Sequence, residues 1–78
     1  MTLPEVIKLT RQKSFMTQDE FAKEMKVSAL TVTRWENGTC KPNLTAMKNL
    51  KQFCISRDLP FDIIESAWLG YTQGGKND

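Results

Sequence analysis

The chain contains no histidine, and its two cysteines, Cys40 and Cys54, are too far apart for a Cys-x-x-Cys pair. Zinc sites in proteins combine cysteine and histidine at short spacings, so no metal site is expected. Two cysteines are also too few for a disulfide framework. We therefore expect Cys54 to pack in the core and Cys40 to be a free thiol in a loop.

Catalytic and membrane signals are equally scarce. The sequence has no glycine-rich phosphate loop and no nucleophile paired with a histidine base, so we expect neither an enzyme nor a cofactor or small-molecule ligand. No apolar run approaches the ~20 residues that span a bilayer, and no signal-peptide pattern opens the chain. These absences predict a cytoplasmic protein with no membrane partner.

The 78 residues have an uneven distribution of charge. Residues 1–57 hold ten Lys or Arg and five Asp or Glu, a net charge of +5. Residues 58–78 hold one Lys and four Asp or Glu, a net charge of −3. Because basic surfaces attract polyanions, the first segment is the one expected to face phosphate groups, although many solvated surfaces carry a similar excess.

Apolar residues recur at helical spacing and none follows the period-two alternation of a strand, which predicts a compact all-α domain of five helices. Side chains that cap helix N-termini precede the first four helices. These helices are expected from Thr2 to about Lys13, from Thr17 to Met25 or Lys26, from Ser28 to about Glu36 with Asn37-Gly38 as the end, and from Asn43 through Cys54. The expected apolar stripe of the fourth helix comprises Leu44, Met47, Leu50 and Cys54, with Phe53 beside it.

A fifth helix is expected to begin at Asp58 or at the Leu59-Pro60 pair. The domain is expected to comprise residues 1–71, with residues 72–78 as a flexible C-terminal tail. The fifth helix carries more apolar side chains than one buried face needs, so part of it is expected to form a homodimer contact. The candidate residues are Phe61, Ile64 and Trp68. The alternative is that all of them close the core of the monomer.

Residues 17–37 predict two short helices joined by a tight connection, which is a helix-turn-helix arrangement. On a helical wheel of the later of these two helices, expected from Ser28 to about Glu36, Val32 and Trp35 point toward the core. The opposite side carries almost no acidic residue and presents Ala29, Leu30, Thr33 and Arg34. Such groups suit base edges in a major groove, where apolar carbons meet thymine methyl groups and arginine bonds to guanine. A single exposed leucine is common on any surface, so the interpretation depends on the whole set.

Residues beside this face are expected to contact the DNA backbone. Gln18 begins the earlier helix, where backbone N–H groups and a side-chain amide can both reach a phosphate. Asn37 and Lys41 follow the later helix and can hold the backbone on its far side. Ser28 is primarily a cap, although a capping hydroxyl can also contact a phosphate.

One structural ion pair is also expected. Glu36 lies at the core edge of its helix and needs a partner if it is buried. Arg11 on the first helix is the best candidate, and the alternative is two solvated charges without mutual contact.

Three segments resemble the Cro/lambda-repressor-like helix-turn-helix family, also called the xenobiotic-response-element family: Met16–Ala22, Val27–Gly38 and Lys41–Leu44. The resemblance spans about residues 3–57 and implies a five-helix domain that binds operator DNA, often as a dimer. It implies phosphate contacts at Gln18 and Asn37, base contacts at the four outward residues named above, and an ion pair between Arg11 and Glu36. We expect the protein to be bacterial, or to be encoded by a phage and located in the cytosol of its host.

The sequence departs from the family at the turn after the second helix, where the usual glycine is replaced by Lys26. If φ must be positive there, lysine costs about 1 kcal/mol relative to glycine. The sequence leaves open whether a phosphate contact by Lys26 offsets that cost.

Three functions are compatible with these features. The first is a transcriptional repressor that binds a double-stranded DNA operator, and the second is an antitoxin or restriction-system controller protein with the same DNA-binding domain. The third is a protein-interaction module that has lost DNA binding. The retained polar and basic outward face argues against the third.

Overall fold

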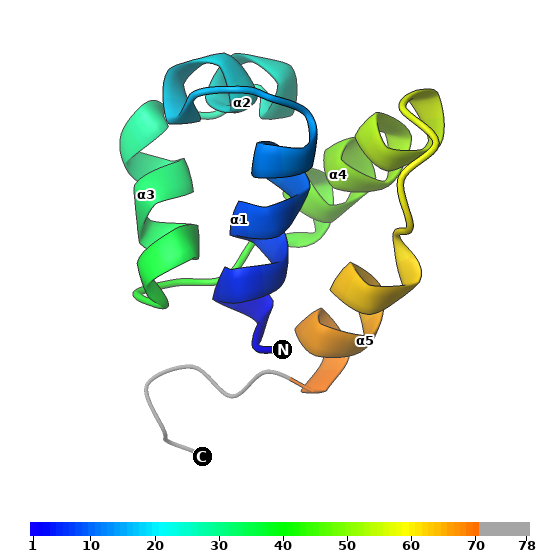
Figure 1. Ribbon diagram of the computed structural model, residues 1–78. Helices are drawn as coiled ribbons and strands as arrows, with labels where there is room; N and C mark the ends of the chain where they lie inside the picture. Colours follow the sequence, from blue (N-terminus) through cyan, green and yellow to red (C-terminus); the bar gives the residue numbers. More distant parts are fainter. Residues whose placement is uncertain (71–78) are drawn as a thin grey trace.

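The structure, a computed structural model, describes residues 1–70 and contains five α-helices and no strand within that range (Figure 1). The helices are α1 (Leu3–Lys13), α2 (Gln18–Met25), α3 (Ala29–Asn37), α4 (Leu44–Ser56) and α5 (Asp62–Gly70). The predicted all-α, five-helix class is confirmed. The predicted tail, residues 72–78, lies outside the described residues. None of the described helices is both long enough and apolar enough to cross a membrane.

Side-chain caps fix where the first four helices begin, as predicted. Thr2 accepts the backbone N–H of Glu5, and the Glu5 carboxylate accepts the backbone N–H of Thr2 at 2.8 Å. The Thr2 hydroxyl also donates to this carboxylate at 3.1 Å. The bond from the Thr2 backbone and then the bond from its hydroxyl lower the pKa of Glu5 below its ordinary value of 4.5. Thr17 and Glu20 form the same reciprocal pair at the start of α2. The caps of α3 and α4 are Ser28 and Asn43.

Helices α1 to α4 share one way of ending, and three of them do so without glycine. A residue one or two positions beyond each helix has a positive φ, and the next N–H bonds to the carbonyl five residues earlier, as in a Schellman-type end. The residues with positive φ are Phe15 (56°), Lys26 (62°), Gly38 (82°) and Asp58 (56°). Lys26 therefore adopts the left-handed conformation that glycine usually provides at this turn.

The start of α5 differs from the prediction. Asp58, two residues beyond the end of α4, adopts the left-handed conformation, so it does not begin the next helix. Pro60 disfavours helical geometry in the residue before it, which keeps Leu59 out of a helix as well. The first turn of α5 instead closes when the N–H of Glu65 bonds to the carbonyl of Phe61 at 2.9 Å.

The core lies where the five helices meet, and each helix contributes to it. Its fully buried members include Ile7 of α1, Phe21 of α2, Val32 of α3, Leu50 of α4 and Ile64 of α5. The rings of Phe21 and Phe53 meet edge to face, with their centroids 5.2 Å apart. Such burial of apolar area is the main source of stability for a domain of this size.

One core prediction is wrong, because Leu44 is 69% exposed. The buried stripe of α4 centres on Leu50, and Leu44 lies six residues earlier, about 120° around the helix. The two cysteines behave as predicted, since Cys54 is buried, Cys40 is half-buried in a loop and both are free. Burial raises the pKa of the Cys54 thiol.

Helix α3 lies along one side of the molecule. α3 packs against α2 and α1, while α4 packs against α2 and α5 packs against α1. In Figure 1, α1 lies between α3 on one side and α4 and α5 on the other. The side of α3 that faces away from α1 is therefore uncovered by the other helices.

Candidate nucleic-acid interface

α3 turns one side into the core and the other toward solvent. Val32 and Trp35 are buried, as predicted. On the other side Leu30 is 57% exposed and Arg34 is also exposed. Ala29 and Thr33 are half-buried at the edges of this surface. The structure thus brings the four predicted base-contact residues to one accessible surface, which we call the α3 face: Ala29, Leu30, Thr33 and Arg34.

The N-termini of α2 and α3 carry backbone N–H groups that have no acceptor among residues 1–70. Because the caps bond to the third residue of each helix, the first two N–H groups stay unpaired. They belong to Gln18 and Asp19 in α2 and to Ala29 and Leu30 in α3. Such groups and the helix dipole favour an anion. The first turn of α2 contains Asp19 and Glu20, whereas that of α3 contains no acid, so the α3 terminus is the more favourable position for a phosphate.

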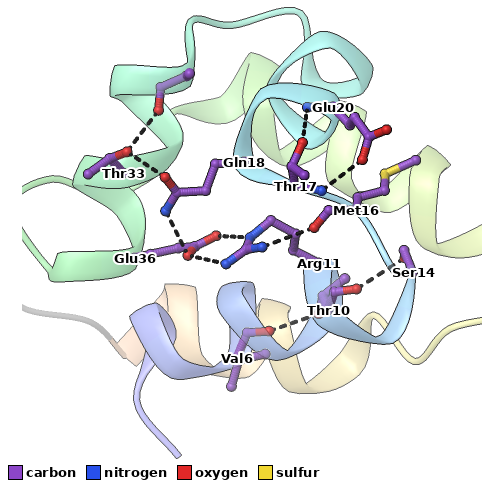
Figure 2. Close-up of polar contacts among 11 residues, drawn as sticks. Val6, Thr10, Arg11, Ser14, Met16, Thr17, Gln18, Glu20, Thr33 and Glu36 are labelled. Atoms are coloured by element: carbon purple, nitrogen blue, oxygen red, sulfur yellow. Dashed lines mark hydrogen bonds and ion pairs between the residues drawn. The ribbon is translucent and has the colours of Figure 1, made fainter.

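A hydrogen-bonded network lies behind the α3 face and includes the predicted ion pair (Figure 2). Arg11 Nε lies 2.7 Å from one carboxylate oxygen of Glu36, and Arg11 Nη2 lies 3.0 Å from the other. Arg11 also donates to the carbonyl of Met16 at 2.9 Å. The hydrogen bond with Glu36, reinforced by charge attraction, raises the pKa of Arg11 above its already high ordinary value.

Gln18 continues this network toward the α3 face. Its side-chain nitrogen donates to Glu36 at 3.1 Å, and its side-chain oxygen accepts the hydroxyl of Thr33 at 2.9 Å. The sequence did not predict these bonds, because nothing in the spacing of the three residues indicates that they meet. One amide hydrogen and the backbone N–H of Gln18 remain for the predicted phosphate contact, which stays a prediction.

The other three predicted phosphate contacts also have partners within the protein. The Ser28 hydroxyl caps Thr31, and the side-chain oxygen of Asn37 accepts the backbone N–H of Thr39 at 3.0 Å. The ammonium group of Lys41 lies 4.7 Å from the ring centroid of Trp68, a cation–π arrangement. These bonds orient the side chains, and their contacts with DNA stay predictions.

The residues expected at a homodimer contact are placed differently from one another. Ile64 is 0% exposed, because it faces the core between α5 and α1, so it is not available to a partner. Phe61 and Trp68 are half-buried and line a groove between α4 and α5. Trp68 is fixed there because its indole N–H donates to the carbonyl of Pro42 at 2.6 Å. Exposed Leu44 and Leu69 lie at the same groove.

Two short capped helices that pack together, the second with an accessible acid-free face, define a helix-turn-helix of the DNA-binding kind. A family model for helix-turn-helix proteins of the Cro/C1 type, HTH_3, matches residues 7–54. The chain belongs to this family of DNA-binding transcription regulators, which is not known for enzymes. No curated protein and no solved structure gives a significant match.

Proposed function

We propose that this chain is a sequence-specific transcriptional repressor that places α3 in the major groove of a double-stranded operator. One observation carries the proposal. The side of α3 opposite Val32 and Trp35 is accessible, contains no acid and combines apolar groups with a guanidinium. A major groove admits an α-helix and presents both methyl groups and hydrogen-bonding edges to it.

Three residues of the α3 face have assigned roles in this proposal. Arg34 bonds to the N7 and O6 acceptors of guanine, and Ala29 and Leu30 contact thymine methyl groups. The phosphate contacts come from residues at the ends of α2 and α3 and in the following loop, which orient the domain on the duplex. These residues are Gln18, Ser28, Asn37 and Lys41.

The proposed active form is a homodimer. The groove between α4 and α5 presents Phe61 and Trp68 beside the exposed side chains of Leu44 and Leu69. If two copies pair through this groove, their α3 helices can read two half-sites about 34 Å apart. Occupation of the operator by such a dimer excludes other proteins from the same DNA, which is sufficient for repression.

The experiment is selection of bound duplexes from a random pool, followed by binding titrations of the enriched duplex at several salt concentrations. We expect an enriched site with two-fold symmetry and an affinity that falls steeply with salt. Arg34→Ala should weaken specific binding by about 1–3 kcal/mol and relax the preference for one guanine. Failure to enrich any duplex, together with no binding to DNA in dilute buffer, would overturn the proposal and favour an interaction module.

A further inference from the structure

We propose that Thr33 reads the 5-methyl group of a pyrimidine, and that it does so because the one hydrogen of its hydroxyl is already donated inside the protein. The operator then depends on a thymine methyl group at the base that faces Thr33. This inference rests on the proposed function, in which the α3 face enters a major groove.

The hydroxyl of Thr33 is held by two acceptors. Its oxygen lies 2.9 Å from the side-chain oxygen of Gln18 and 3.1 Å from the backbone carbonyl of Ala29. Figure 2 shows the hydroxyl oxygen of Thr33 turned toward the side-chain oxygen of Gln18. A threonine hydroxyl has one hydrogen to donate, so a base acceptor must compete with two acceptors that are already in place.

The orientation of the Gln18 amide is itself determined by charge. Its nitrogen end faces the Glu36 carboxylate at 3.1 Å. The reversed orientation would bring the amide oxygen against that carboxylate and turn N–H groups toward Thr33. Since Arg11 fixes the position of Glu36 through two bonds, the amide oxygen is held toward Thr33. The hydroxyl of Thr33 therefore already donates to an acceptor in the protein without DNA.

The other branch of the Thr33 side chain is a methyl group, and it lies on a half-buried residue at the edge of the α3 face. Ala29 and Leu30 are one helical turn earlier and add carbon atoms to the same strip. In the major groove, thymine differs from cytosine by its methyl group as well as by its hydrogen-bonding edge. A strip of carbon atoms at this position distinguishes bases by that methyl group.

The test replaces each thymine of the enriched duplex with uracil, which keeps the hydrogen-bonding edge and removes only the methyl group. At the position of each half-site that faces Thr33, we expect uracil to weaken binding of the wild-type protein about fourfold, the value for one buried methylene-sized group. Thr33→Val keeps a methyl group and should preserve this thymine-to-uracil ratio. Thr33→Ser keeps the hydroxyl and should reduce the ratio to about one, and thermal unfolding checks that both variants fold.

The outcomes separate this inference from the function on which it rests. If no duplex is enriched, the proposed function fails. If a duplex is enriched but uracil is tolerated at every thymine, the function stands and the inference is overturned. The inference is also overturned if Thr33→Ser keeps the ratio, because a group other than the Thr33 methyl would then contact the thymine methyl group.

Discussion

Arg11 on α1 donates hydrogen bonds from two nitrogens to the carboxylate of Glu36 on α3, at 2.7 and 3.0 Å. The two side chains are only 14% and 5% exposed, so neither charge is well solvated without the other. The pair joins the first helix to the helix proposed to read DNA, and it also sets the orientation of Gln18. Loss of the pair should therefore affect both stability and the shape of the α3 face.

Removing one partner of this pair is expected to be costly. Arg11→Met leaves the Glu36 carboxylate buried without its cation, and the free energy of unfolding should fall by about 3 kcal/mol. The double variant Arg11→Met/Glu36→Leu removes both charges and should be more stable than Arg11→Met alone. Urea denaturation measures all three proteins. A loss below about 0.5 kcal/mol in the single variant would mean that the pair is solvated and adds little.

Lys26 is expected to destabilise the turn between α2 and α3, because its φ of 62° disfavours residues with a Cβ. Lys26→Gly should raise the free energy of unfolding by about 1 kcal/mol. Lys26→Ala is the matched control, since it removes the charge but keeps the Cβ. Thermal unfolding compares the variants, and an alanine variant as stable as the glycine variant would contradict the expectation. If Lys26→Gly and Lys26→Ala lose the same amount of DNA affinity relative to the wild type, the lysine charge contacts a phosphate.

The capping box of α1 should make stability depend on pH in the acidic range. The pKa of Glu5 is lower in the folded chain than its ordinary value of 4.5, so ionisation of this carboxyl group stabilises the folded state. This contribution is present above the ordinary value and is lost as pH falls through the folded pKa. Glu5→Gln keeps an acceptor but cannot ionise. Melting temperatures from about pH 6 to about pH 3 should therefore converge for the two proteins, and a constant difference would contradict this assignment.

Leu30→Asp should abolish DNA binding with little effect on folding, because the side chain is 57% exposed and the new charge would face phosphates. The free energy of unfolding should change by no more than about 0.5 kcal/mol. Ile55→Asp is the matched control, since Ile55 is 61% exposed near the end of α4, which Figure 1 draws on the opposite side from α3. Titration of a labelled duplex should show binding by the control variant. A large loss of stability in Leu30→Asp would instead place Leu30 in the core.

The starts of the first four helices and the buried side of α3 were predictable from sequence, because both depend on local chemistry. A capping hydroxyl or amide acts within its own turn, and Val32 and Trp35 follow from helical periodicity alone. The Arg11–Glu36 pair was also predictable, since a charged residue at the edge of a core requires a partner.

The features that sequence did not predict depend on tertiary placement or on strained backbone. The ends of α1 and α4 have positive φ at Phe15 and Asp58, where no glycine marks the position. The bonds of Gln18 join α2 to α3, and the position of Lys41 over Trp68 depends on how α5 docks. Periodicity also could not divide the apolar residues of α5 between core and surface, because several of its sides carry them.

The placement of the α3 face in the groove can be tested directly by following backbone amide chemical shifts while the enriched duplex is added. We expect the largest changes on residues 28–37, on Lys41 and on the first two residues of α2, with small changes along α4 and α5. Large changes confined to the groove between α4 and α5, with α3 unaffected, would contradict this placement.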